Sequence, residues 1–284
     1  MSKLLLFCLF FTCISCTNYG QLTYMAELPN NLEENSGMVS MKDSTIWMIE
    51  DNGNKDDIYK VDFKGELLKS FDVKNAKNND WEDLTKDKNG NVYIADIGNN
   101  KNNRKNLVIY KLPNPEKEPG DKIDAEEIKF YYPEQEEFPP KKSKRFYDAE
   151  AIFHHGEKLF IVTKNRSNPF SGDTFIYTVP DSKGEYTAKL VGTVAICDDW
   201  ETCQITSIDI SPNGKKIVAL SYGKLFVFTD FTWDDFSIGK MKTIDLGIRT
   251  QLESICFIND TTLLLSDEVS HNRGGNLYSF TLTD

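Results

Sequence analysis

Short runs of alternating hydrophobic and polar residues, separated by turn-forming residues, repeat along most of the chain. The clearest example begins with a strand that opens on Glu82, reverses at Gly90 and returns in a second strand that ends on Asp96. Gly and Asn tolerate the left-handed backbone of such a tight turn. Because two strands joined this way are antiparallel, we expect Glu82 and Asp96 to lie on the same rim of the fold.

The same unit occurs five times, at spacings of about 47 to 68 residues. Each copy opens with a polar residue, then a small or short residue, then an apolar one. A repeat of about 40 to 50 residues with about four strands per copy is typical of a β-propeller blade. The opening positions are Asn35-Ser36, Glu82, Glu150, Thr206-Ser207 and Glu253.

The last copy lacks a fourth strand, and residues 22–28 form an alternating strand with no assigned partner. The two omissions cancel if the N-terminal strand completes the last blade, since closing the ring removes an open sheet edge. We therefore predict an all-β, five-bladed propeller over residues 22–284. A six-bladed ring with a degenerate blade in the long middle section is the alternative. That section contains an insertion around 113–145, whose basic end at 139–145 is interpreted as a solvated loop.

The N-terminus has the features of a targeting segment. Lys3 precedes a short apolar run that is too short for a stable membrane span, so residues 1–15 are predicted to be a signal peptide. A small residue followed by Cys16 resembles a bacterial lipobox, although Cys13 replaces the usual Leu. We expect lipid attachment at Cys16, with 16–21 as a tether, and the protein anchored at the periplasmic or outer face of a bacterial membrane. Ordinary signal cleavage before Tyr19 is the alternative.

Charge and cysteine usage narrow the partners and the redox setting. A formal net charge of −11 argues against nucleic-acid binding, which needs basic patches. In an exported protein disulfides persist, so a bridge between Cys197 and Cys203 is expected; zinc is disfavoured because no His or third Cys lies near. Cys256 alternates into an apolar strand and is interpreted as an inert core thiol.

Three of the blade-opening residues are glutamates. In a propeller the first strand of each blade lines the axis, so Glu82, Glu150 and Glu253 are predicted to converge. Carboxylates in such a space repel each other and need a cation, protons or water between them. Oxygen ligands without His or Cys favour calcium. The alternative is structural, with each Glu bonding the backbone of the neighbouring blade.

A second polar ring is predicted at the ends of the second strands and in the loops that follow. Because it mixes Lys and Arg with carboxylates, it suits a small phosphate or carboxylate ligand, although Asp, Asn and Gly are also ordinary turn formers. Tyr222, Glu268 and His271 lie in the same ring. The candidate ligand-binding residues are Asp51, Asn52, Asp96, Asn99, Arg104, Lys164, Arg166 and Asp267.

These motifs resemble known exported propellers. Residues 80–84, 93–100 with Arg104, and 148–152 are similar to bacterial propellers of the SdiA-regulated and esterase-like phytase group, many of which are lipoproteins of unassigned function. The Glu-opened blades, with residues 36–38 and 48–53, also resemble five-bladed calcium-activated nucleotidases. The second resemblance implies an axial calcium near Glu82, Glu150 and Glu253; it does not by itself imply nucleotidase activity.

The first interpretation is therefore a lipid-anchored, monomeric propeller that binds a small anionic ligand or a protein partner on its Glu-bearing face, with an axial calcium. Nucleophilic catalysis is poorly supported, since the sequence contains no nucleophile elbow, phosphate-binding loop or zinc-protease motif. A calcium-dependent phosphoester or ester hydrolase is the second interpretation, with a carboxylate as base. A pure interaction platform is the third.

Overall fold

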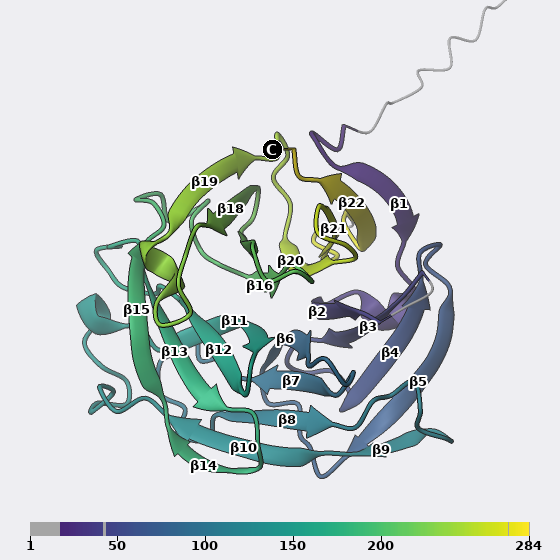
Figure 1. Cartoon of the computed structure of the whole chain (residues 1–284), viewed down its shortest axis with the longest axis horizontal. Coiled ribbons are helices and arrows are strands. Elements are labelled where there is room, and N and C mark those ends of the chain that lie inside the picture. The colour runs from purple at the N-terminus through teal and green to yellow at the C-terminus, as the bar shows by residue number, and fades with distance from the viewer. Residues whose placement is uncertain (1–17, 42–43, 272, 284) are drawn as a thin grey trace, which may run out of the picture.

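The computed structural model describes residues 18–41, 44–271 and 273–283. Five β-sheets are arranged around a central axis as the blades of a propeller (Figure 1). The predicted five-bladed all-β fold is thereby confirmed. The predicted signal peptide and Cys16 lie outside the described residues. Among the residues that are described, no helix has the length and apolar character needed to cross a membrane.

Blades one and two each contain four antiparallel strands and a fifth, parallel strand at the outer edge. Blade one consists of β2 (Asn35–Ser40), β3 (Thr45–Glu50), β4 (Asp57–Asp62), β5 (Leu67–Lys74) and β9 (Lys122–Asp124). Blade two consists of β6 (Trp81–Lys86), β7 (Val92–Asp96), β8 (Val108–Leu112), β10 (Glu126–Tyr131) and β14 (Gly184–Thr187).

Blades three to five have four strands each. Blade three consists of β11 (Asp148–His155), β12 (Lys158–Lys164), β13 (Asp173–Pro180) and β15 (Lys189–Ala195). Blade four consists of β16 (Ser207–Ile210), β17 (Ile217–Leu220), β18 (Lys224–Thr229) and β19 (Lys240–Asp245). Blade five consists of β20 (Leu252–Phe257), β21 (Thr262–Asp267), β22 (Asn276–Thr281) and β1 (Thr23–Glu27). Three short 3₁₀ helices complete the described elements: η1 (Asn30–Leu32), η2 (Lys142–Lys144) and η3 (Phe236–Ile238).

The N-terminal strand closes the ring as predicted. β1 pairs antiparallel with β22, with Thr23 opposite Ser279 and Glu27 opposite Asn276. The first and last strands of the described chain therefore share one blade, and the edge of β22 is covered.

Two outer strands come from the neighbouring blade. β9 belongs to the connection that leads into β10 of blade two, yet it pairs parallel with β5 of blade one. β14 belongs to a connection within blade three, yet it pairs parallel with β10. The segment predicted as one insertion, 113–145, thus contains both β9 and β10. These strands link blades one, two and three at their outer edges.

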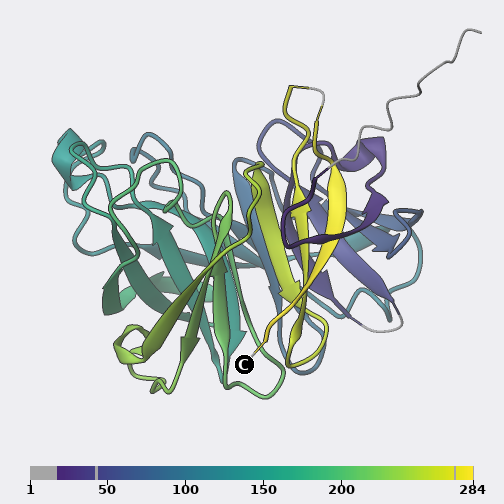
Figure 2. The same cartoon turned by 90° about the horizontal axis from the view of Figure 1, so that it is seen from above.

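The hydrophobic core lies between the blades. Each of five buried clusters joins two neighbouring sheets; one packs Tyr93 and Ile109 of blade two against Ile152 and Tyr177 of blade three. In each blade the innermost strand starts at one rim, which we call the Glu-bearing face, and this rim is uppermost in Figure 2. The ends of the second strands and the loops after them lie at the same rim.

Candidate functional site

A β-bulge marks the start of four innermost strands. The pairing register shifts between Asn35 and Gly37, and again around Glu82, Glu150 and Glu253. A bulge inserts one unpaired residue and re-aims its side chain. The residue that the sequence repeat singled out is therefore the bulged residue in blades one, two, three and five.

Serine and threonine at the blade openings tie neighbouring blades together. The Ser36 hydroxyl donates to the carbonyl oxygen of Trp81 at 2.8 Å, and the Thr206 hydroxyl donates to that of Leu252 at 2.7 Å. Among the described residues, no such bond joins Glu82, Glu150 or Glu253 to the backbone of the next blade. The glutamates thus differ from Ser36 and Thr206 in what they contact.

Three carboxylates gather where blades one and two meet the axis. One oxygen each from Asp51, Asp80 and Glu82 lies within 4.8 Å of the other two. Asp51 directly follows β3, Asp80 directly precedes β6, and Glu82 is the bulged residue at the start of β6. The side chain of Asn52 lies beside Asp80 and opposes the rise of its pKa. Within the described chain the Glu82 carboxylate has no hydrogen bond and no ion pair.

Gly98 forms the floor of this acidic cluster. A Cβ atom at Gly98 would lie 2.0 Å from Glu82 Oε1 and 2.5 Å from Asp80 Oδ2. Both carboxylates therefore pack against the bare Cα of Gly98, which follows β7. Any larger residue at this position would push the two carboxylates away.

Burial makes these carboxyl groups weaker acids than exposed carboxyl groups. It raises the pKa of Asp51 to about 7, and it also raises the pKa of Asp80. The pKa of Glu82 lies well above its ordinary value, first because of burial and then because of the charges of Glu150 and Asp51. Without a cation the cluster therefore retains protons near neutral pH, and a bound divalent ion would compete with those protons.

Glu150 is already neutralised by two cations. Lys164, whose side chain is only 3% exposed, forms an ion pair with Glu150 Oε2. Arg166 contacts Glu150 Oε1 at 2.9 Å and Asp148 Oδ2 at 2.6 Å. Lys164 and Arg166, predicted as ligand-binding cations, therefore balance carboxylates of their own blade.

Glu253 has a third environment. It lies beside the Tyr222 hydroxyl, which accepts a hydrogen bond from Lys164 Nζ at 3.0 Å. Burial raises the pKa of Glu253 well above its ordinary value, whereas the charge of Lys164 opposes that rise. The three predicted glutamates thus lie around one axis in three settings: Glu82 in the acidic cluster, Glu150 in an ion-pair network, and Glu253 against Tyr222.

Several residues of the second predicted ring hold loops in place. Arg104 Nη2 forms an ion pair with Asp96 Oδ1 at 2.8 Å, and the backbone N–H of Asp80 donates to the same carboxylate oxygen at 3.0 Å. Asn99 Oδ1 accepts from the backbone N–H groups of residues 103 and 104. Asp267 accepts from the Tyr278 hydroxyl at 3.0 Å. These contacts position the loops around the acidic cluster.

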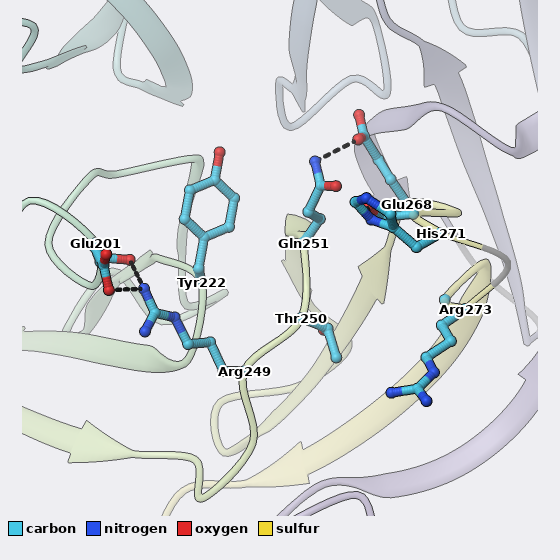
Figure 3. A pocket seen from close by; sticks show the side chains of 10 residues that line it. Glu201, Tyr222, Arg249, Thr250, Gln251, Glu268, His271 and Arg273 are labelled. Carbon is cyan, nitrogen blue, oxygen red and sulfur yellow. Dashed lines mark hydrogen bonds and ion pairs between the residues drawn. The ribbon is translucent and has the colours of Figure 1, made fainter.

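A cavity of about 800 Å³ opens beside the axis between blades four and five (Figure 3). Its wall includes Tyr222 and Glu268, and Gln251 Nε2 donates to Glu268 Oε2 at 3.0 Å. Burial raises the pKa of Glu268 to about 8, and the nearby charges of Asp51 and Glu34 add to that rise. The charge of Asp51 in the acidic cluster therefore affects the ionisation of Glu268 in the cavity wall.

Sequence reasoning did not name Asp80, Gly98 or the cavity-lining residues Arg249 and Gln251 among the candidate metal or ligand-binding residues, although it placed Gly98 in the second polar ring. The signal for Asp80 in the sequence is its spacing of two from Glu82, which in a regular strand would put both side chains on one side. Gly98 stands two residues after Asp96, but its role depends on the approach of another strand. Arg249 and Gln251 precede Glu253 in the loop that leads into β20, and nothing in that loop's composition distinguishes them from solvated residues.

No protein-family model matches the chain, and no curated protein sequence matches it either. Among solved structures, the chain is similar to the PQQ-bound form of an aldose sugar dehydrogenase from Streptomyces coelicolor, with a TM-score of 0.52 and 9% identity over 93% of this chain and 98% of that one.

Two weaker likenesses also involve bacterial proteins. One is a candidate 6-phosphogluconolactonase from Bacteroides uniformis, with a TM-score of 0.42, 14% identity, and coverage of 90% of this chain and 68% of that chain. The other is the extracellular domain of a candidate hybrid two-component system from B. thetaiotaomicron, with a TM-score of 0.39, 15% identity, and coverage of 88% and 28%. The chain is a β-propeller, and its likeness to the sugar dehydrogenase concerns the fold alone.

Proposed function

We propose that this chain is an exported, lipid-anchored propeller that binds a small anionic ligand on its Glu-bearing face and holds a calcium ion at Asp51, Asp80 and Glu82. The observation that carries the proposal is the convergence of these three carboxylates within 4.8 Å. Neighbouring Glu150 has Lys164 and Arg166 as counter-charges, whereas Glu82 has none among the described residues. An added cation would complete the charge balance of the axis.

The donor chemistry fits calcium. All three side chains offer carboxylate oxygens, and the cluster includes neither His nor Cys, which disfavours zinc and copper. Calcium accepts six to eight oxygen ligands in a flexible arrangement, so three carboxylates leave positions for water or for an anionic ligand. The ion would supply positive charge next to the cavity. This assignment keeps Glu82 from the predicted set and adds Asp51 and Asp80, while Glu150 and Glu253 stay nearby as charged neighbours.

Thermal unfolding under controlled metal tests the calcium site. After exhaustive chelation, a calcium titration is expected to raise the melting temperature saturably, because a ligand that binds only the folded state stabilises it. Glu82→Gln and Asp80→Asn should abolish most of this rise. Glu201→Gln serves as the control, since Glu201 lies on the same face and is 66% exposed. If the unmodified protein melts at the same temperature in calcium and in chelator, the proposed calcium site is ruled out.

A calcium-dependent phosphoester or ester hydrolase is the second candidate. The observation in its favour is that Glu268, with a pKa raised to about 8 by burial, lines the same cavity as His271 and Tyr222. A carboxyl group with a pKa near neutrality suits general acid–base chemistry. Turnover of 4-nitrophenyl phosphate or 4-nitrophenyl acetate that requires calcium and is lost in Glu268→Gln would support the hydrolase. If the protein binds the ligand but does not turn it over, the result supports a binding protein. If it shows neither binding nor turnover, the remaining interpretation is a platform for protein partners.

Export and lipid attachment are part of the proposal. The leader and the lipobox-like sequence before Cys16 support them, as does the resemblance of residues 80–84, 93–100 and 148–152 to exported propellers of the SdiA-regulated and esterase-like phytase group. Expression in a bacterial host should place the protein in the membrane fraction. Cys16→Ser should move it to the periplasmic fraction or leave the leader uncleaved, whereas membrane retention of a cleaved Cys16→Ser protein would contradict lipid attachment.

A further inference from the structure

A second cavity on the Glu-bearing face combines cations with aromatic rings. It has a volume of about 430 Å³ and is formed mainly by Lys142, Arg145, Arg166, Phe170 and Trp200, with Ser167 and Asn168 between them. No Asp or Glu lines it, in a protein whose net charge is −11. Its volume falls in the range of small-molecule sites, which is about 300–1,000 Å³.

The basic wall is built into the fold. The carbonyl oxygen of Lys142 accepts from the backbone N–H of Asn168 at 3.0 Å, and that of Arg145 accepts from Arg166 at 2.9 Å. These two bonds dock η2 and its flanks onto the loop that follows β12. The basic run that the sequence presented as a solvated loop is thus one wall of a cavity.

The charge of this wall is only partly balanced. Arg166 is paired with Asp148 and Glu150. In contrast, Lys142 and Arg145 form no ion pair with any other described residue. Arg145 Nε is buried and has no hydrogen-bond acceptor. Two cationic side chains, one with an unsatisfied donor, therefore stand ready for an anion.

A polar side chain next to Arg166 also lacks an acceptor. Gln204 is 4% exposed, and its Oε1 accepts from Arg166 Nη1 at 3.4 Å. Its Nε2 is buried and has no partner within the described structure. A buried amide donor without an acceptor lowers the stability of the folded protein. The Gln204 amide is therefore a second sign that an acceptor is missing near Arg166.

The aromatic wall is presented by a constrained loop. Cys197 and Cys203 are joined by a disulfide, and Trp200 stands in the middle of the loop that they close. Asp199 fixes the loop by accepting from the backbone N–H of Glu201 at 3.0 Å. The Trp200 ring meets the Phe170 ring edge-on, with centroids 5.4 Å apart, and the Trp200 residue remains 44% exposed. A large apolar face is therefore held open beside the cations.

We infer that this cavity binds an organic anion in which a phosphate or carboxylate group is joined to a flat ring, with Lys142 and Arg145 taking the anionic group and Trp200 stacking on the ring. The inference rests on the ligand-binding role proposed for the Glu-bearing face and gives the chemical class of the ligand. It does not depend on the calcium ion, because the acidic cluster at Asp51, Asp80 and Glu82 uses other residues.

Matched probes test the two halves of the inference. Phenyl phosphate, inorganic phosphate and phenol are titrated into the purified protein by calorimetry, and benzoate serves as the carboxylate probe. Each titration is done in calcium and in chelator. Phenyl phosphate is expected to bind about five- to tenfold more tightly than inorganic phosphate, since ring stacking adds to the ionic contact. It should also change the tryptophan fluorescence, because Trp200 is exposed in the cavity wall. Trp47 and Trp81 are fully buried, and Trp233 is half-buried and stacks on His155, outside the cavity.

Variants locate the site. Trp200→Leu should remove the preference for phenyl phosphate over inorganic phosphate, together with the fluorescence change. Arg145→Ala and Lys142→Ala should each lower the affinity for both phenyl phosphate and inorganic phosphate. The expected loss for Arg145→Ala is about ten- to hundredfold. Lys141→Ala is the control, because Lys141 precedes η2 and does not line the cavity. Melting curves show whether each variant is folded. If Arg145→Ala does not fold, Lys142→Ala still tests the basic wall of the cavity.

The outcomes separate this inference from the calcium proposal. Phenyl phosphate binding in chelator that is lost in Arg145→Ala supports the anion site even when calcium has no effect. Equal affinity for phenyl phosphate and inorganic phosphate, unchanged in Trp200→Leu, overturns the assignment of a flat ring. Binding that is absent, or that is the same in Arg145→Ala, Lys142→Ala and the unmodified protein, overturns the site as a whole.

Discussion

The Asp83 carboxylate of blade two accepts a hydrogen bond from the Ser207 hydroxyl of blade four at 3.1 Å, across the axis of the propeller. The same carboxylate accepts from the backbone N–H of Ile152 in blade three at 3.0 Å. The Ser207 hydroxyl oxygen in turn accepts from the backbone N–H of Ile255 in blade five at 3.2 Å. Four of the five blades are therefore linked by two fully buried side chains.

Removal of this link should destabilise the whole ring. Asp83→Ala leaves several buried donors without an acceptor, each costing about 1–3 kcal/mol, so a loss of about 3–5 kcal/mol is expected. Ser207→Ala should cost about 1–3 kcal/mol. The measurement is urea unfolding followed by fluorescence.

The control and the double variant sharpen that test. Asp234→Ala, at an exposed position, should be close to neutral. The double variant should cost clearly less than the sum of the single variants, because the two side chains share one hydrogen bond. Additive losses, or a loss below about 1 kcal/mol for Asp83→Ala, would show that the cross-axis bond does not hold the blades together.

Gly98→Ala should impair the calcium response more than the fold. The added methyl group would occupy the space of Glu82 Oε1 and Asp80 Oδ2 and so displace two of the three proposed ligands. We expect at least about a tenfold weaker calcium affinity, measured by the shift of melting temperature across a calcium titration. The melting temperature in chelator is the internal control. A normal calcium titration of Gly98→Ala would mean that the ion, if bound, is held elsewhere.

The sequence repeat predicted the blades because every blade needs the same alternation of apolar residues and the same turns. The pairing of β1 with β22 followed from the missing strand of blade five. The pairing of β9 and β14 could not be predicted in this way. Each strand has only three or four residues, and each forms its hydrogen bonds with a strand of another blade.

The site was predictable only in part for a related reason. The position of Glu82 at the axis follows from its place in the repeat. That Lys164 neutralises Glu150, while Asp80 and Asp51 join Glu82, depends on which rotamers and loops meet across blades one to three. Such contacts arise between segments far apart in the chain, and local pattern carries no information about them.

Glu268 should make the stability of the calcium-free protein depend on pH. Burial raises its pKa to about 8 in the folded protein, whereas an exposed glutamate in the unfolded chain titrates near 4.3. Between these values the folded state keeps a proton that the unfolded state releases, so the free energy of unfolding falls as pH rises and levels off above about pH 8. Below about pH 4 the group has no effect, because it is protonated in both states.

Glu268→Gln removes this slope, since the amide cannot ionise and its oxygen can still accept from Gln251. In chelator, the variant should melt about 2–4 °C above the unmodified protein at pH 8.5 and at nearly the same temperature at pH 4.5. Glu201→Gln, in the wall of the same cavity but exposed, should show no such trend. A difference in melting temperature that stays constant with pH would contradict the raised pKa.

The closing strand should be replaceable in trans. β1 is held in blade five by its pairing with β22, by burial of Leu22, Ala26 and Leu28, and by stacking of Tyr19 on Tyr24. Deletion of residues 1–28 removes about 5 kcal/mol of apolar burial, which corresponds to a drop of about 10 °C or more in melting temperature. It also exposes the edge of β22, so light scattering should show association. Deletion of residues 1–18 is the control and should leave the melting temperature unchanged.

A synthetic peptide of residues 19–28 should then raise the melting temperature of the shortened protein saturably, because the missing strand binds only the folded ring. A scrambled peptide of the same composition should have no effect, since register and the inward-facing leucines decide the fit. If the protein without residues 1–28 melts like the control, the ring does not depend on β1 for closure, and the outer edge of β22 must be protected by its own side chains.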